Sequence, residues 1–328
     1  MSGAAPLVEV RDLHVEYPGR DGPARAVDGV TLEVREGETL ALVGESGCGK
    51  TTLARTIMGL RRPTSGEVRF RGEPLSYSRS GLREHRRRAQ MIFQDPTGAL
   101  NARQTLYEAV AEGIRIQGLK GDEEQIVAEA LSSAGLRPPE SFFTRYPYEI
   151  SGGQRQRVII AGAMALDPDL LVADEPVSAL DASVRGEILA LMLRLVRQAG
   201  VSILVVTHDL GLAWNIADRV AVMYLGRIVE DAPAEQLLTA PQHPYTRALL
   251  SVVPETTHME PQILSGEAPD PTRIPAGCRF HPRCPLVESG EAERLGIEGQ
   301  CRGEDPLFLP ACHAVRSADE HEAYVHER

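Results

Sequence analysis

The sequence predicts an α/β fold in which helices cover a parallel β-sheet. Two observations support this fold class. Short apolar segments with strand character recur along the chain, and segments with helical periodicity separate them. A third observation is a glycine-rich loop that directly follows a buried strand and leads into a helix. At 328 residues the chain is long enough for one large or two modest domains.

The N-terminal part is expected to begin with strands. Residues 7–10 and 30–34 alternate apolar and polar side chains, and a turn rich in Gly, Pro and Asp joins them. A buried strand is predicted at residues 39–43, where every side chain but the first is apolar. The glycine-rich loop follows, and the next helix begins at about Lys50.

The middle of the chain is expected to be helical first and then to return to strands. Leu106, Val110 and Ile114 recur at helical spacing within a segment of helical pattern from about 104 to 165. Apolar strands follow at 170–173 and 202–206, and a long amphipathic helix at about 183–198 lies between them. Strands joined through helices in this way indicate a parallel sheet.

After Pro254 the periodic pattern gives way to Pro, Gly and Cys. We therefore expect a main domain over residues 1–254, with an inserted helical subdomain at about 96–162, and a small cysteine-containing C-terminal extension over 255–328.

Charge argues against a nucleic-acid partner. The net charge is −11, and the extension holds 14 Asp and Glu against 7 Lys and Arg, whereas nucleic-acid binders are usually basic. The one basic cluster, residues 83–88, is interpreted as a solvated face or an ion-pairing segment.

Hydropathy predicts that the chain does not cross a membrane. The longest nearly uncharged apolar run near the middle, residues 158–166, is far shorter than the roughly 20 residues that a spanning helix needs. The first six residues lack the basic and apolar regions of a secretory signal, which favours a cytoplasmic protein.

The glycine-rich loop fits the phosphate-binding pattern G-x-x-x-x-G-K-[ST]. Glycines let consecutive backbone N–H groups curl around phosphate oxygens, and the following helix points its positive end at them. Lys50 adds a charge for the β- and γ-phosphates, Thr51 a hydroxyl for Mg²⁺, and Thr52 a hydroxyl for the α-phosphate. The loop residues predicted to bind ATP are Gly44, Ser46, Gly47, Cys48, Gly49, Lys50, Thr51 and Thr52. The Cys48 side chain itself is expected to fill space in the loop.

The strand at 170–173 ends in two carboxylates, the pattern known as Walker B. Asp174 is expected to hold Mg²⁺ through water, and Glu175 to act as the general base for the attacking water. An acidic pair at a strand end is common by itself, and the phosphate-binding loop favours the functional interpretation here.

A third motif, Ile150 followed by Ser151, Gly152, Gly153 and Gln154, lies at a predicted helix start. It resembles the Leu-Ser-Gly-Gly-Gln signature of the ABC ATPases, a P-loop NTPase family, with Ile in place of the first Leu. In that family the signature binds the γ-phosphate of ATP held by a partner subunit. The resemblance covers about residues 6–255 and implies a nucleotide-binding domain that hydrolyses ATP.

The resemblance also implies roles for four further residues. Gln94 matches the Q-loop glutamine that senses Mg²⁺ and the γ-phosphate and touches the membrane subunits, and Asp181 matches the D-loop across the dimer. His208 matches the switch histidine that contacts the γ-phosphate. Tyr17 matches the aromatic residue that stacks on adenine, although a strand tyrosine packed in the core is the alternative.

Three segments look like those of the branch of this family that imports oligopeptides and dipeptides. Nickel importers are close relatives of that branch. The three segments are residues 43–50, 176–181 and His243-Pro244-Tyr245-Thr246-Arg247-Ala248-Leu249-Leu250. The resemblance implies a second ATPase subunit arranged head to tail, two membrane permeases and an extracytoplasmic solute-binding protein. It also implies a location at the cytoplasmic face of the membrane.

Four of the five cysteines lie within 35 residues of one another: Cys278, Cys284, Cys301 and Cys312. In a reducing compartment such clustering suggests a metal before disulfides. Four thiolates suit an iron–sulfur cluster or Zn²⁺, and free thiols are the third possibility. Similar tails in the peptide-importer branch are associated with a [4Fe–4S] cluster. His281 and His313 leave a mixed Cys/His zinc site open.

Two other functions fit the sequence less well. DNA-associated ATPases share the signature but carry long coiled-coil or zinc-module insertions, whereas only about 100 residues separate Lys50 from Ser151 and no sustained heptads occur. A translation-factor-like ABC protein needs two phosphate-binding loops in one chain. The sequence therefore favours an ATPase that powers an importer. It does not specify the solute or distinguish an identical partner from a paralogue.

Overall fold

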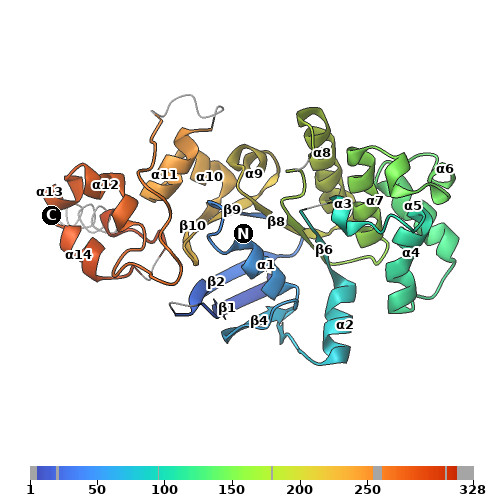
Figure 1. Cartoon of the computed structure of the whole chain (residues 1–328), viewed down its shortest axis with the longest axis horizontal. Coiled ribbons are helices and arrows are strands. Elements are labelled where there is room, and N and C mark those ends of the chain that lie inside the picture. Colours follow the sequence, from blue (N-terminus) through green and yellow to red (C-terminus); the bar gives the residue numbers. More distant parts are fainter. Residues whose placement is uncertain are drawn as a thin grey trace, which may run out of the picture.

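A six-stranded sheet lies in the middle of the molecule (Figure 1). The structure is a computed structural model and describes residues 6–19, 22–94, 96–178, 180–253, 261–306 and 309–315. The strand order is β10-β9-β3-β8-β7-β6; neighbours from β9 to β6 run parallel, and β10 pairs antiparallel with β9. The strands are β3 (Thr39–Val43), β6 (Ala89–Ile92), β7 (Leu170–Asp174), β8 (Ser202–Thr207), β9 (Arg219–Tyr224) and β10 (Arg227–Pro233).

The inner strands that lead to the loops of interest are buried along their whole length. Every residue of β3, β7 and β8 is buried, as expected for strands covered on both faces. Register pairs Leu40 with Leu204 and Val172 with Leu204. The carboxyl ends of β3, β7 and β8 therefore meet at one edge, and the loops that follow them face a common space. The predicted parallel sheet is confirmed.

A second sheet is antiparallel and has the order β2-β1-β4-β5. Its strands are β1 (Pro6–Tyr17), β2 (Ala24–Arg35), β4 (Ser65–Phe70) and β5 (Glu73–Pro74). The predicted N-terminal strands are confirmed, but both are longer than their alternating cores suggested. Helix α1 (Lys50–Ile57) contacts β1 and β2 on one side and β7 and β8 on the other, so it packs between the two sheets.

Helices dominate residues 96–164, as the periodicity predicts. Thr105 and Ser151 each form a capping box at a helix start, and Asp122 caps a third helix. The last helix, α7, packs against the three α-helices α3, α4 and α5. The elements are α3 (Pro96–Ala99), α4 (Leu106–Gln117), α5 (Glu123–Ser133), α6 (Glu140–Phe143), η1 (Pro147–Glu149) and α7 (Gly152–Met164).

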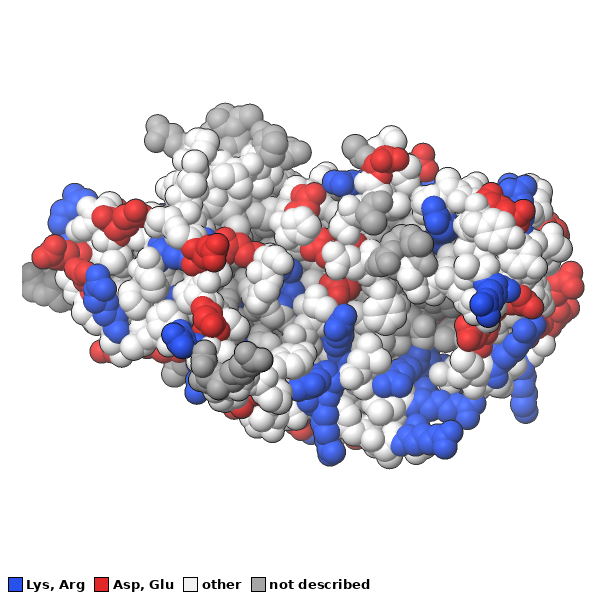
Figure 2. Space-filling model, viewed as in Figure 1, with Lys and Arg blue, Asp and Glu red and all other residues white. Residues whose placement is uncertain are grey.

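The basic cluster at 83–88 falls on α2 (Arg79–Arg88), which precedes β6. Arg88 forms an ion pair with Asp169, and Arg83 donates to the carbonyl of Ile116. Figure 2 shows Lys and Arg side chains gathered over this part of the molecule. The segment therefore combines ion pairing with a solvated face, as predicted.

Four helices cover the sheet after the Walker B strand. Helix α8 (Ala182–Ala199) is the predicted long amphipathic helix. It is followed by α9 (Leu210–Ile216), α10 (Ala234–Thr239) and α11 (Pro244–Ser251). His243 caps α11 by accepting a hydrogen bond from Tyr245 N–H, and its Nε2 donates to the carbonyl of Ala311. Burial lowers the pKa of His243 to about 4, so the ring is neutral.

The C-terminal extension is built from short helices at the end of the molecule opposite α4–α6 (Figure 1). They are η2 (His281–Arg283), α12 (Pro285–Glu288), α13 (Glu291–Arg294) and α14 (Glu298–Gly303). The predicted boundary at 254/255 lies outside the described residues.

An aromatic side chain of the extension packs into the main core. Phe280 is 1% exposed and packs against Tyr224, Tyr245 and His243, with ring centroids 5.2 to 5.7 Å apart. The extension has few large apolar residues, so it can bury little apolar surface within itself. Phe280 provides burial that the count of apolar residues did not reveal, because its partners lie on β9 and α11.

Candidate active site

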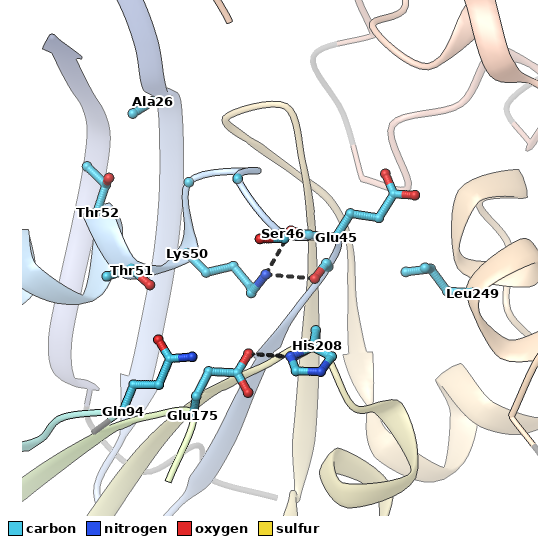
Figure 3. A pocket seen from close by; sticks show the side chains of 13 residues that line it. Ala26, Glu45, Ser46, Lys50, Thr51, Thr52, Gln94, Glu175, His208 and Leu249 are labelled. Carbon is cyan, nitrogen blue, oxygen red and sulfur yellow. Dashed lines mark hydrogen bonds and ion pairs between the residues drawn. The ribbon is translucent and has the colours of Figure 1, made fainter. Parts of the chain in front are cut away.

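A cavity of about 580 Å³ opens where β3, β7 and β8 end (Figure 3). It brings together most of the predicted loop residues with Gln94, Glu175 and His208. The residues that line it are Ala26, Gly44, Glu45, Ser46, Gly47, Gly49, Lys50, Thr51, Thr52, Gln94, Glu175, His208 and Leu249.

Two glycines let the loop lie against neighbouring backbone. A Cβ atom at Gly44 would come within 2.1 Å of the Met223 carbonyl oxygen, and one at Gly49 within 2.0 Å of the Ala26 carbonyl oxygen. Both residues have positive φ, 151° and 113°. Only glycine fits at either position, so the loop keeps the curvature that directs its N–H groups at an anion.

Lys50 is 6% exposed, and its ammonium group is held by the loop itself. The Nζ atom donates to the carbonyls of Gly44 at 2.7 Å and Glu45 at 2.8 Å. A full positive charge is thus fixed beside the backbone N–H groups at the start of α1, where a polyphosphate would be most strongly attracted.

Thr51 and Asp174 form the polar pair expected for Mg²⁺. The Thr51 hydroxyl donates to the Asp174 carboxylate at 3.1 Å. Asp174 is 3% exposed, and burial raises the pKa of its carboxyl group. An oxygen donor set of one hydroxyl and one buried carboxylate at a phosphate loop fits the requirements of Mg²⁺, which usually keeps several waters.

Glu175 and His208 are in direct contact. A Glu175 carboxylate oxygen accepts from the backbone N–H of His208 at 3.0 Å and lies 2.7 Å from Nδ1 of its ring. Glu175 has a φ of 50°, which is unusual for a residue other than glycine, and its N–H is bonded to the Val206 carbonyl. This backbone turns the side chain away from the sheet and toward the cavity.

Gln94 follows the end of β6 and faces the same space. Figure 3 shows its amide beside the Glu175 carboxylate, with both side chains below Lys50. Three strand ends, those of β6, β7 and β8, thus contribute Gln94, Glu175 and His208 to one wall.

Tyr17 and Cys48 are placed beside the cavity and do not line it. The Tyr17 hydroxyl lies 3.4 Å from that of Thr52, and the Arg61 guanidinium lies 4.3 Å above the Tyr17 ring. Cys48 is 6% exposed, packs in the core behind the loop, and has a pKa raised by burial. Its side chain fills space, as expected.

The signature residues lie apart from the cavity of their own chain. Ser151 is exposed, and its hydroxyl accepts from Gln154 N–H at 3.3 Å at the start of α7. Gly152, Gly153 and Gln154 are in the first turn of that helix, and Asp181 precedes α8. Neither segment contributes to the cavity wall.

Three lining residues were not predicted from the sequence: Ala26, Glu45 and Leu249. Glu45 occupies a variable position of the phosphate-binding pattern, so the motif itself gives it no role. Leu249 lies in the distinctive 243–250 segment, and this segment was the sequence feature that could have identified Leu249 as a cavity residue. Ala26 lies on β2 and carried no signal.

The four clustered cysteines line one small cavity of about 10 Å³, together with His281 and His313. Burial, with the neighbouring thiols, raises the pKa of Cys278 to about 12 and of Cys301 to about 11, and burial also raises the pKa values of Cys284 and Cys312. Within the described residues, no three His, Cys, Asp or Glu side chains are arranged so that they could hold a metal ion.

None of the helices in the described part of the chain is both long and apolar enough to span a bilayer.

Sequence comparison gives two family matches. Residues 27–178 match the family described as ABC transporter, and residues 229–290 match the oligopeptide/dipeptide transporter C-terminal region. The chain is 43% identical to the provisionally named oligopeptide transport ATP-binding protein YkfD of Bacillus subtilis, over 97% of this chain and 98% of that protein. It is 41% identical to the oligopeptide transport ATP-binding protein AppF of Bacillus subtilis, over 94% and 97%.

Structure comparison finds the same architecture. A dimeric ATP-binding cassette solved in a post-hydrolysis state with ADP and phosphate superposes with a TM-score of 0.62 and 29% identity. The match covers 69% of this chain and 98% of that cassette.

Proposed function

The chain belongs to the ATP-binding proteins of the ABC transporter family, and we propose that it hydrolyses ATP to power the import of di- or oligopeptides. The observation that carries the peptide assignment is the match of residues 229–290 to the C-terminal region of oligopeptide/dipeptide transporters. This region includes α11 and η2, so the part of the chain that is specific to the branch adjoins the cavity through Leu249.

In the proposed reaction the chain's residues act mainly by position and charge. Lys50 and the loop N–H groups bind the phosphates. Thr51 and Asp174 would hold Mg²⁺, which neutralises charge on the β- and γ-phosphates. Glu175 accepts a proton from the attacking water, and His208 orients that carboxylate through two contacts. Gln94 completes the same wall.

The proposed active unit is a head-to-tail pair of ATPase subunits. Ser151 is exposed and lies outside its own chain's cavity, so a second chain is needed to bring Ser151, Gly153 and Asp181 to a nucleotide. Two membrane permeases and an extracytoplasmic solute-binding protein would complete the importer, with this subunit at the cytoplasmic face. Closure on ATP and opening after hydrolysis would drive the permeases.

A DNA-associated ATPase is the alternative from another class. In its described part, the segment between Lys50 and Ser151 folds into the short strands β4, β5 and β6 and into helices no longer than the 12 residues of α4. It offers no coiled-coil arm within those residues, which favours the transporter proposal.

Glu175→Gln tests the proposed chemistry. The amide cannot accept the proton, so hydrolysis should fall on the order of 10²–10⁴-fold while ATP binding persists. Turnover and nucleotide affinity are to be measured on the same preparation. A separate experiment tests the transport role: the ATPase activity of the wild type should rise when it is reconstituted with its permeases and a peptide-loaded binding protein. Turnover near that of the wild type would reject Glu175 as the base.

For the cysteine cavity we infer a single metal centre, a [4Fe–4S] cluster with Zn²⁺ as the alternative. The support is the donor set, since four cysteines and two histidines surround one cavity. No three of the described His, Cys, Asp or Glu side chains are arranged to hold a metal ion, and the cavity measures about 10 Å³, so these side chains would have to move apart and reorient to admit the centre.

Anaerobic purification with visible absorption and analysis of iron, sulfide and zinc tests this centre. Proteolysis of a variant with all four cysteines changed to serine reports the order of the extension independently of ATPase activity. A wild-type protein without iron or zinc, together with an ordered extension in the serine variant, would contradict the proposal.

A further inference from the structure

The C-terminal extension reaches the phosphate-binding loop directly. The Arg283 guanidinium of η2 donates to both carboxylate oxygens of Glu45, at 2.7 and 3.0 Å. This bidentate geometry is the strong form of an Arg–carboxylate contact. The Arg283 side chain is 7% exposed and that of Glu45 30%, so the pair is shielded from solvent mainly on the arginine side.

Glu45 is held at three points of its structure. Its N–H donates to the Tyr245 hydroxyl at 2.9 Å, and its carbonyl accepts from Lys50 Nζ at 2.8 Å. Its carboxylate is the partner of Arg283 and, as Figure 3 shows, points away from Lys50 and Glu175. The carboxylate is thus directed away from Lys50, although Glu45 is among the residues that line the cavity.

Arg283 is itself fixed in place. Its Nε donates to the Ser265 carbonyl at 3.2 Å, and its guanidinium lies 6.0 Å from the Tyr224 ring centroid. A second arginine of the extension, Arg279, donates to the Leu225 carbonyl and pairs with Asp28 of β2. These contacts hold Arg283 in a fixed position on the extension, so that Arg283 can set the position of Glu45.

We propose that Arg283 is a positioning residue of the ATP site, and that through it the C-terminal extension sets the affinity for ATP. This inference rests on the proposed function, because it takes ATP as the ligand. Two physical effects act in the same direction. The contact holds the Glu45 backbone where Lys50 and the loop need it, and it neutralises a carboxylate that would otherwise repel the phosphates of ATP. Arg283 does not line the cavity and touches no reacting atom.

The direct test is Arg283→Gln in the full-length protein, with equilibrium binding of ATP and steady-state ATPase kinetics. Kd and KM for ATP should rise between about 3- and 30-fold, while kcat at saturating ATP stays within about 2-fold of the wild type. R283K keeps the charge without the fork and should fall between R283Q and the wild type. The matched control is R302Q, because among the described residues the ion pair of Arg302, in the same extension, is with Glu298 of its own helix α14.

Glu45→Gln and the double variant separate positioning from general loss of structure. Both single changes break the contact that positions the Glu45 backbone, but E45Q also removes the carboxylate that repels phosphates. E45Q should therefore weaken ATP binding less than R283Q does, and the double variant should bind ATP no more weakly than R283Q. If R283Q does not fold, the ATP affinity of E45Q tests the proposal by itself. Unchanged or tighter ATP binding in E45Q, additive losses, or an equal loss in R302Q would overturn the inference. A wild type that neither binds nor hydrolyses ATP would instead refute the proposed function.

Discussion

At the scale of single residues, stability and function make opposite demands on Asp174. The carboxylate is 3% exposed and has one hydrogen bond from a side chain, that of Thr51. Ionising it in so buried a place costs free energy, and this is why its pKa is raised. The ionised form is nevertheless the one that binds a divalent cation. The site therefore keeps a charge that weakens the metal-free protein.

Asp174→Asn should accordingly stabilise the protein in EDTA while abolishing hydrolysis. A neutral amide of the same shape avoids the buried charge, and we expect a gain of about 0.5–2 kcal/mol at neutral pH in thermal or urea unfolding. The sign of the pH effect follows from the raised pKa. The native state holds the Asp174 proton more tightly than the unfolded chain, so this residue's contribution to stability falls as pH rises through its native pKa.

The variant should lack this part of the pH dependence. Asp169, on the loop before β7, is the matched control, because its pKa is lowered by Arg88 and Arg71 despite burial. Asp169→Asn should therefore destabilise the protein. A D174N variant less stable than the wild type in EDTA would contradict this account.

At the scale of elements, a helix or strand was predicted well from the sequence where neighbouring residues define it, and poorly where contacts between distant residues define it. The bounds of β3 were predicted correctly because Thr39 and four consecutive apolar residues lead directly into the glycine loop. Strand β1 was predicted too short because its register shifts several times against β2, which interrupts the alternation. The pair Arg283–Glu45 joins residues 238 positions apart, and no local pattern can report such a contact. The cavity wall was predicted through motifs, whereas Glu45 and Ala26 depend on tertiary packing.

The attachment of the extension gives a prediction at this scale. Phe280→Ala removes a 1%-exposed ring from its contacts with β9 and α11, which should cost about 3–5 kcal/mol. We expect the extension to become sensitive to limited proteolysis and, because Arg283 follows three residues later, ATP affinity to fall as well. Leu295→Ala, at a residue 51% exposed, is the control and should change neither property. An F280A protein as protease-resistant as the wild type would show that other contacts hold the extension.

At the scale of the whole molecule, the sheet lies between two parts with different tasks. On one side lie helices α4–α7, with the signature at the start of α7. On the other side lies the extension, whose Arg283 contacts Glu45 of the phosphate loop. Within one chain Ser151 lies outside the cavity that contains Lys50, so the two halves of the proposed composite site do not meet. Assembly is therefore part of the proposed mechanism.

Ser151→Arg and Lys50→Ala test this requirement together. In S151R the cavity residues are intact, so the monomer should bind ATP nearly as well as the wild type, yet hydrolysis should be lost because a bulky cation blocks the signature face. K50A should lose ATP binding itself, since it removes the charge fixed at Gly44 and Glu45. If the chain pairs with itself, mixing the two variants should restore activity that neither has alone, because one site of each mixed dimer combines an intact loop with an intact signature. Activity of the mixture is to be compared with that of each variant at equal total protein. ATP affinity in S151R as low as in K50A would show that the signature belongs to its own chain's site and would overturn the head-to-tail arrangement.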